Sequence, residues 1–382
     1  MKVIISVLGR FHAFNLAQQV QKRNSLYRLI SSYPTFEIAK YGIAPSSINS
    51  ILHVEILACA WRKLPSCLKQ QRNLQLWFSE NFDRSVSKKL LPEFDVFVGW
   101  SGSSLFSLQK AKEMEAFTVV ERGSSHMEYQ TQILKEEYEH WGLEFTATHQ
   151  GVYDREIQEY QEADRIAIPS LFVKRTFIER GIPENKLIHV PYGTSLTEFY
   201  PVPKEDNTFR VIHCGGVNLR KGVQYLIQAF HELNLPNAEL WVVGSVSPEI
   251  EPFLAKYQSD RIILKGKHPQ NQLRWFYSQC SVFCLASIEE GLAMVQPQAM
   301  ACGLPIIHTT NTGGEDIVRD GIDGFCVPIR DVEAIKAKIM FFYENPDKRD
   351  EMGNNALEQV KSSFSWDKYG ESIVKAYAQI ST

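Results

Sequence analysis

The sequence lacks several features that would mark other classes of protein. No stretch approaches the roughly 20 consecutive apolar residues that a membrane-spanning helix needs. A formal net charge of −3 gives no reason to expect nucleic acid as a partner. The seven cysteines include no Cys-x-x-Cys pair and no Cys/His cluster with zinc spacing, so we expect no zinc site.

Cysteine usage and the N-terminus predict a cytoplasmic protein. The cysteine count is odd, and several cysteines, such as Cys284, lie in apolar runs. This pattern is typical of buried free thiols in a protein of a reducing compartment. Residues 1–8 are apolar but run directly into Gly9 and Arg10, with neither a long apolar segment nor a small-residue cleavage site. We therefore expect this segment to be a first strand rather than a signal peptide.

Length and apolar patterning predict two α/β domains. A chain of 382 residues exceeds what one hydrophobic core usually serves. Short apolar runs that end at Gly, Ser or Pro alternate with longer helical patterns, which is typical of parallel sheets with crossover helices. The predicted strands are 2–8, 26–32, 95–99, 117–121, 165–169 and 187–190, then 209–215, 239–244, 261–266, 281–285, 305–309 and 324–327.

A linker rich in proline and polar residues, 200–208, separates the two sets of six strands. We therefore expect two doubly wound, Rossmann-like domains, residues 1–200 and 209–364. Ligands of such sheets bind beyond the carboxyl ends of the strands, so two sheets that face each other would share a central cleft. We therefore expect the ligand-binding residues to follow the carboxyl ends of the strands.

A glycine turn with two basic residues opens the second domain. Gly215 and Gly216 follow the predicted strand 209–215, and Arg220 and Lys221 stand directly before an amphipathic helical pattern. Glycines let the backbone approach a ligand, and a helix N-terminus offers free N–H groups to an anion. The pattern favours a bound diphosphate. A solvated basic turn is the alternative, because the dinucleotide pattern Gly-x-Gly-x-x-Gly is not matched.

A second loop follows the predicted strand 281–285. Pro297 is tolerated only in the first turn of a helix, so a helix should begin near 294–297 and end before Gly303. Glu290 then lies between a strand's carboxyl end and a helix's amino end, where it can accept hydrogen bonds from sugar hydroxyls. The neighbouring candidates for sugar or ribose contacts are Gly291, Leu292, Ala293 and, eight positions after Glu290, Gln298.

These two loops resemble the glycosyl transferases group 1, the large retaining family 4 of glycosyltransferases with the GT-B fold. Glu290 stands in the place of the family's first Glu, which contacts the donor sugar, and Gln298 stands for the second Glu, which binds the ribose. Lys221 matches the family's diphosphate site, where Arg220 would compensate for an arginine that the family often has after the first glycine. Ala293 replaces the second glycine of the loop.

The resemblance extends over most of the chain and implies further roles. Residues 163–170 and 192–199 look like family elements, and the segment from 365 to 382 looks like the helix that returns to the first domain. A histidine that follows the strand matching 117–121 faces the donor sugar in the family, which makes His126 a catalytic candidate beside Glu290. A lone histidine is more often structural, so that alternative stays open.

The remaining site candidates line the predicted cleft. The family's glycine loop after the first strand lies near the phosphates or the acceptor, which implies Gly9, Arg10 and His12. Ser103, in the loop after the strand 95–99, could line the acceptor side or belong to a plain turn. Gly266, Lys267 and His268 resemble the loop that binds the nucleobase, but backbone contacts there do not separate uridine from guanosine.

The resemblance implies transfer of a sugar from a UDP or GDP sugar to a hydroxyl, with retention by front-face attack. No pair of the Asp-x-Asp kind follows a predicted strand, so we expect metal independence and no cofactor besides the donor. The acceptor could be a glycan, a lipid-linked sugar or a small molecule. Two alternatives remain: a GT-B-like sugar-nucleotide epimerase, and a non-catalytic protein that binds sugar nucleotides or glycans.

One segment suits two interpretations. Residues 56–79 contain no acidic residue, while Arg62, Lys63, Lys69 and Arg72 alternate with apolar side chains. A basic amphipathic segment can lie on an anionic membrane surface, which would place the enzyme at the inner membrane face. The alternative, which we favour, is a helical pair that packs on the N-terminal sheet with a solvated basic face.

Overall fold

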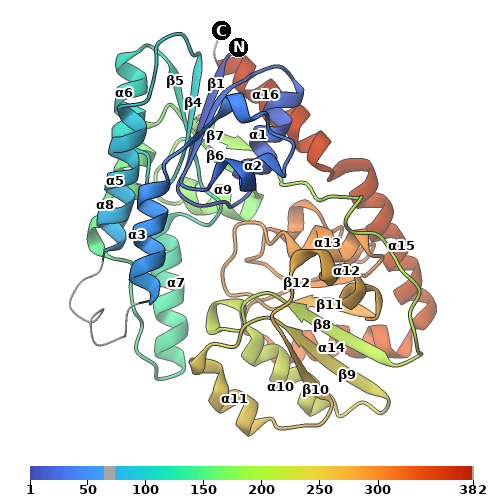
Figure 1. The fold of residues 1–382 in the computed structure, drawn as a ribbon. Coiled ribbons are helices and arrows are strands. Elements are labelled where there is room, and N and C mark those ends of the chain that lie inside the picture. The colour runs from blue at the N-terminus through green and yellow to red at the C-terminus, as the bar shows by residue number, and fades with distance from the viewer. Residues whose placement is uncertain (64–73, 381–382) are drawn as a thin grey trace.

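The computed structural model describes residues 1–63 and 74–380, which form two α/β domains (Figure 1). The N-terminal domain is built on a seven-stranded parallel sheet of order β3-β2-β1-β4-β5-β6-β7. The C-terminal domain has a six-stranded parallel sheet of order β10-β9-β8-β11-β12-β13. The strands are β1 (Val3–Val7), β2 (Leu26–Ser31), β3 (Ile48–Ser50), β4 (Val96–Trp100), β5 (Phe117–Glu121), β6 (Arg165–Ile168), β7 (Leu187–His189), β8 (Phe209–Cys214), β9 (Ala238–Val243), β10 (Ile262–Gly266), β11 (Val282–Leu285), β12 (Ile306–Thr309) and β13 (Gly324–Val327).

The predicted fold class is confirmed, with one strand more than expected. Each predicted apolar run is a strand within one or two residues, because the central strands of a parallel sheet are buried on both faces and therefore apolar throughout. β1, β4 and β8 are buried at every position. The unpredicted strand is β3, which has only three residues, two of them polar, and pairs at the edge with β2.

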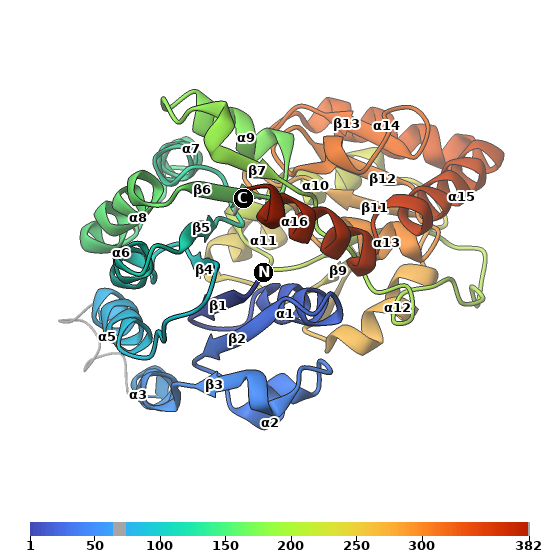
Figure 2. The same cartoon turned by 90° about the horizontal axis from the view of Figure 1, so that it is seen from above.

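Helices cover both faces of each sheet. In Figure 2, α1 and α16 lie side by side on one face of the N-terminal sheet, and α5, α6 and α8 cover the other. The N-terminal helices are α1 (Ala13–Lys22), α2 (Thr35–Ala39), α3 (Leu52–Lys63), α5 (Gln75–Ser87), α6 (Leu105–Glu113), α7 (Met127–His140), α8 (Gln150–Glu162) and α9 (Leu171–Ile178). Those that follow are α10 (Val223–Leu233), α11 (Glu251–Lys256), α12 (Gln270–Ser278), α13 (Val295–Ala301), α14 (Val332–Glu344), α15 (Pro346–Ser363) and α16 (Trp366–Ile380).

The chain crosses between the domains twice, and the two crossings touch. The first lies after β7 and includes Tyr200–Asn207, which has neither helix nor strand; the second joins α15 to α16. Thr194 N donates to Phe364 O at 2.8 Å, and Trp366 N donates to Thr194 O at 3.3 Å. A Cβ on Gly193 would lie 2.5 Å from Trp366 N, so only glycine allows this approach.

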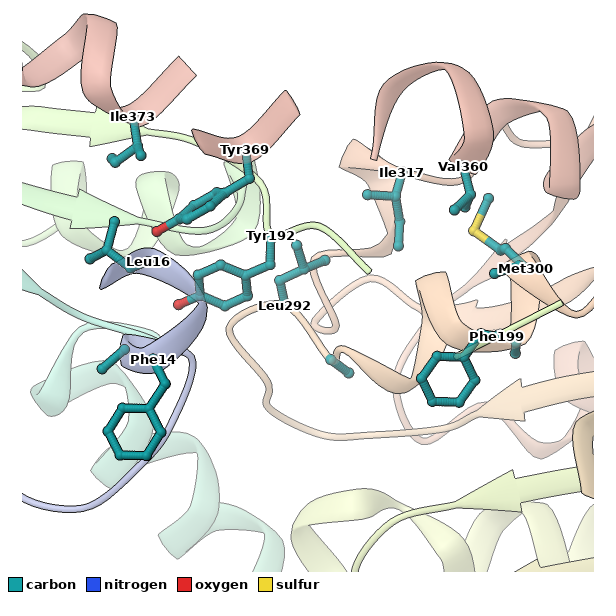
Figure 3. Packing of buried hydrophobic residues seen from close by; sticks show 14 of the residues in the cluster. Phe14, Leu16, Tyr192, Phe199, Leu292, Met300, Ile317, Val360, Tyr369 and Ile373 are labelled. Atoms are coloured by element: carbon teal, nitrogen blue, oxygen red, sulfur yellow. The ribbon is translucent and has the colours of Figure 1, made fainter. Parts of the chain in front are cut away.

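The hydrophobic core is continuous from one domain to the other. One buried cluster includes Phe14 on α1, Tyr369 on α16 and Met300 on α13 (Figure 3). Tyr192 from the first crossing and Leu292 from the loop after β11 lie near its middle. The donor loop predicted from the sequence is therefore anchored in packed side chains at the domain junction.

The segment 56–79 is only partly described. Residues 56–63 belong to α3 and 75–79 to α5, while 64–73 lie outside the described residues, so the predicted helical pair is seen only at its two ends. Ile56 is 64% exposed on α3, where Cys59 is also exposed rather than buried as expected. Across residues 1–63 and 74–380, no helix is both long and apolar enough to cross a membrane.

Candidate functional site

The two predicted diphosphate cations lie on a short turn between β8 and α10. Gly215 has φ of 141°, and a 3-10 turn, η3 (Leu219–Lys221), follows it. Gly222 then adopts φ of 61°, and a Cβ there would lie 2.6 Å from the carbonyl carbon of Ala286 and closer still to its oxygen. Only glycine fits at position 222, and its lack of a side chain allows η3 to lie directly against the loop that follows β11.

The structure brings Arg220 and Lys221 to Glu290. Lys221 Nζ forms an ion pair with Glu290 Oε1, and Arg220 Nε lies 3.9 Å from the same oxygen. Glu290 N donates to Asn311 O at 2.9 Å, which fixes the loop to the segment after β12. The carboxylate of Glu290 is therefore the partner of both predicted diphosphate cations.

A second carboxylate, Glu289, belongs to this site and was missed in the sequence. Its side chain is fully buried, and its Oε2 lies 2.9 Å from Arg220 Nη2. Ser125 donates to its Oε1 from both N (3.0 Å) and Oγ (2.6 Å). Ser124 Oγ donates to the same oxygen at 2.8 Å, and Gln130 Nε2 donates to Oε2 at 2.9 Å. A carboxylate of the C-terminal domain is thus inserted between groups of the N-terminal domain.

The surroundings of Glu289 keep it charged. Burial works against the ionised carboxylate, but the charge of Arg220 and the hydrogen bonds from Ser125 and Gln130 outweigh it. Together they lower the pKa of Glu289 to about 2. Arg220 and Lys221 therefore face two acidic side chains, Glu289 and Glu290.

The two domains are in close backbone contact at Gly291. Ser170 Oγ, at the start of α9, donates to Gly291 O at 2.6 Å. A Cβ on Gly291 would lie 2.6 Å from the carbonyl carbon of Gly123 and 2.9 Å from Ser124 N. The backbones of the donor loop and of the segment after β5 are therefore in direct contact, and the domains are closed on each other here.

The other residues of the donor loop face inward. Leu292 is buried in the cluster of Figure 3, and Ala293 N donates to Thr312 O at 3.3 Å. Gln298 on α13 is buried, and its Oε1 accepts from Tyr277 OH at 3.4 Å. The helix α13 begins after Met294, as the position of Pro297 predicts, and Gly303 follows it with φ of 81°. The ribose contact of Gln298 stays a prediction.

His126 directly follows Ser125, which donates to Glu289, and its ring packs within the N-terminal domain. It is the N-cap of α7, where Nδ1 accepts from Glu128 N at 3.3 Å. Its ring lies against Tyr160 and Phe177 inside the N-terminal domain. Burial, with smaller contributions from Arg180 and Arg122, lowers its pKa to about 4. A catalytic contact of His126 with the donor stays a prediction.

The acceptor candidates occupy different environments. Gly9 accepts from Ser31 Oγ, and Arg10 is exposed with its guanidinium 5.9 Å from the Tyr41 ring. Ser103 is buried and donates to Trp100 O at 3.3 Å.

His12 is also buried, rather than facing an open cleft. Its Nε2 lies 3.3 Å from Glu121 Oε2, and its ring packs on Tyr192 with centroids 4.1 Å apart. Glu121 also accepts from Tyr377 OH of α16 at 3.2 Å. Among these candidates the structure leaves Arg10 the most accessible.

The predicted nucleobase loop lies at the end of the edge strand β10. Gly266 and Lys267 are exposed, and Gly266 has φ of 72°. The ring of His268 is held by Gln272 and by Lys265 O, and lies 4.4 Å from the Phe276 ring. The exposed residues of this loop are therefore Gly266 and Lys267. Elsewhere in the described part of the chain, no group of three or more His, Cys, Asp or Glu could hold a metal ion.

Comparison with known proteins finds similarity to glycosyltransferases. Residues 197–359 match the family model described as glycosyl transferases group 1. An uncharacterized glycosyltransferase of Methanocaldococcus jannaschii is 29% identical over 219 residues, which are 57% of this chain and 60% of the relative. The capsular polysaccharide biosynthesis glycosyltransferase CapM of Staphylococcus aureus is 28% identical over 234 residues, 56% of this chain and 61% of the relative. The matches thus span about three fifths of these relatives.

Solved structures share the architecture over the whole chain. Sucrose-phosphate synthase from Thermosynechococcus elongatus superimposes with a TM-score of 0.72 at 18% identity, covering 100% of this chain and 99% of that one. HepE of Anabaena in complex with UDP-glucose gives a TM-score of 0.73 at 14% identity, covering 99% of this chain and 100% of that one. The chain therefore has the GT-B fold, and the group 1 match over 197–359 supports an enzyme of the glycosyltransferase class.

Proposed function

We propose that the protein is a retaining glycosyltransferase that moves a sugar from a UDP or GDP sugar to a hydroxyl acceptor. The observation that carries the proposal is the meeting of Arg220, Lys221 and Glu290 at the contact between the two domains. Two cations beside a strand-end carboxylate can bind a diphosphate and an adjacent sugar together. HepE of Anabaena, whose fold is similar, has been solved with UDP-glucose, which supports a nucleotide-sugar donor.

In the proposed mechanism, the donor diphosphate replaces Glu290 as the partner of Lys221. Glu290 is then free to accept hydrogen bonds from the donor sugar, so sugar recognition follows nucleotide binding. Arg220 and Lys221 neutralise the charge that builds on the leaving diphosphate, and stabilising developing charge is usually the largest catalytic contribution. Retention implies that the acceptor hydroxyl attacks from the face that the diphosphate leaves.

Domain closure completes the proposed site. The contacts of Gly291 with Gly123 and Ser170 would exclude water around the reacting sugar and favour transfer over hydrolysis. The donor enters while the domains are apart, because these contacts close the space between them. The acceptor, a glycan, a lipid-linked sugar or a small molecule, would approach from the N-terminal domain near Arg10.

We also propose peripheral membrane contact through α3. Its exposed apolar side chains include Leu52, Ile56 and Leu57, with exposed fractions of 38%, 64% and 46%. The exposed basic residue Lys63 ends the same helix. An apolar face beside positive charge suits an anionic lipid surface and would bring a lipid-linked acceptor to the enzyme.

Thermal unfolding against a panel of UDP, GDP, ADP and their sugars tests the main proposal. A ligand that binds only the native state raises the melting temperature. At a hundredfold excess over Kd it adds about 2.7 kcal/mol to the free energy of unfolding. We expect one nucleoside diphosphate and its sugar to act, and Lys221→Ala to remove most of the effect. Lys348→Ala, which changes an exposed lysine on α15 paired with Glu351, is the matched control. No shift with any nucleotide would contradict the proposal and favour a non-catalytic protein.

A further inference from the structure

Two adjacent glutamates of the donor loop have different partners. Glu290 faces Lys221, which belongs to its own domain. Glu289 points to the other side, where Ser124, Ser125 and Gln130 of the N-terminal domain surround its carboxylate. Its carboxylate therefore contacts both the N-terminal domain and Arg220.

Arg220 is oriented by Glu289 and by the N-terminal domain together. Its Nε donates to the backbone oxygen of Glu289 at 3.1 Å, and its Nη2 lies 2.9 Å from Glu289 Oε2. The same Nη2 donates to Ser124 Oγ at 3.1 Å. Two of these three contacts depend on closure, because Ser124 comes from the N-terminal domain and because the carboxylate of Glu289 is itself held by that domain.

We propose that Glu289 is a positioning residue that sets Arg220 for the diphosphate only when the domains close. The inference rests on the proposed function, because it concerns the cation that would stabilise the leaving group. In the open state Glu289 loses the hydrogen bonds of Ser124, Ser125 and Gln130, and its carboxylate no longer has one fixed orientation. Arg220 then binds the nucleotide but is not aimed at the charge that develops during transfer. Domain closure and charge stabilisation are coupled through one carboxylate.

Glu289→Gln separates positioning from binding. The amide keeps the shape of the side chain, but one of its two ends becomes a donor. On the Oε2 side the NH₂ group would face Arg220 Nη2 and Gln130 Nε2, and on the Oε1 side it would face Ser125 N. The variant also removes one negative charge beside the diphosphate, which favours anion binding. We therefore expect at least a tenfold fall in kcat, since small misplacements of a catalytic group cost up to about a hundredfold. The Kd for the nucleoside diphosphate should stay the same or decrease.

Glu137→Gln is the matched control for the loss of a buried contact between the domains that does not involve Arg220. Glu137 on α7 is also a fully buried carboxylate that joins the domains. It accepts from Arg330 Nε at 2.6 Å, and from Gln224 Nε2 and Tyr225 OH, each at 2.8 Å. A variant here weakens a cross-domain contact of the same kind without changing a partner of Arg220. We expect kcat to stay within about threefold of the wild-type value.

The assay follows release of the nucleoside diphosphate from UDP-glucose, or from the sugar nucleotide that stabilises the wild-type protein most. Low kcat with unchanged or tighter Kd in Glu289→Gln, and near wild-type kcat in Glu137→Gln, is the expected result. Wild-type kcat in Glu289→Gln, or an equal loss of kcat in both variants, would overturn the inference.

A third variant keeps the test decisive if Glu289→Gln does not fold. Ser125→Ala removes the hydroxyl that donates to Glu289 Oε1 at 2.6 Å and leaves every charge in place. A several-fold lower kcat at constant KM supports the inference, and wild-type kcat overturns it. Failure of the proposed function would look different, because the wild-type protein itself would neither bind nor turn over any sugar nucleotide in the panel.

Discussion

Gly291→Ala should hold the two domains apart. The added Cβ would lie 2.6 Å from the carbonyl carbon of Gly123 and 2.9 Å from Ser124 N, and both are backbone atoms that cannot rotate away. Ordinary contacts of a Cβ begin at about 3.4 Å, so the loops must separate by roughly 1 Å. Overpacking at a tight contact costs about 1–3 kcal/mol. That free energy acts on closure rather than on the fold of either domain.

The expected consequence is a large loss of turnover with little loss of stability. A separation of about 1 Å lengthens the hydrogen bond from Ser170 Oγ to Gly291 O, now 2.6 Å, and those around Glu289. Misplacement on this scale costs roughly a hundredfold in rate. The assay combines kcat for donor turnover, the melting temperature, and small-angle X-ray scattering with and without UDP. We expect the radius of gyration to stay at its open-state value when UDP is added.

Gly123→Ala is the graded control for this prediction. Gly123 is the partner of Gly291 in this contact, and a Cβ on Gly123 would meet only the Tyr192 hydroxyl, at 3.1 Å. A shift of a few tenths of an ångström relieves that approach, so kcat should fall only a few-fold. Wild-type kcat and a normal UDP-induced contraction in Gly291→Ala would refute the argument that this contact limits closure.

Two further predictions concern His126 and α3. His126→Asn keeps a helix N-cap but removes a side chain whose pKa burial lowers to about 4, against about 6.5 when unfolded. The wild-type protein should lose stability as pH falls from about 6.5 to 4, because only the unfolded state binds that proton, and His126→Asn should lose less when melting temperatures are compared. A fall in kcat beyond tenfold at unchanged melting temperature would support the catalytic prediction, and unchanged kcat would contradict it. For α3, Ile56→Glu should weaken co-sedimentation with phosphatidylglycerol vesicles about tenfold or more, since burial of one such side chain contributes about 1.5–3 kcal/mol. Leu264→Glu, at a residue 46% exposed on the C-terminal domain, should have no effect, and equal sedimentation of all three proteins would contradict membrane contact.

The sequence predicts the fold well because buried parallel strands and their end loops leave a local pattern. The run 117–121 is a strand with the predicted bounds, and Pro297 correctly places the start of α13. β3 leaves no such pattern, since three residues at a sheet edge need little apolar character. Its existence depends on pairing with β2, which is a tertiary contact.

The site is harder to predict, because side-chain direction depends on partners that are distant in the sequence. Glu289 and Glu290 are adjacent and chemically alike, but only the folded chain directs one to Ser125 and the other to Lys221. The sequence likewise places His126 at a strand end without showing that its ring packs on Tyr160. A signal for Glu289 does exist: two consecutive acidic residues in an apolar loop require two sets of buried partners.

The paired crossings of the chain limit how the protein can open. The two crossings lie together at Thr194 and Ser365. Since both connections between the domains pass through this place, we expect the domains to open by rotation about it. Displacement grows with distance from the axis and is largest where α7 meets α10.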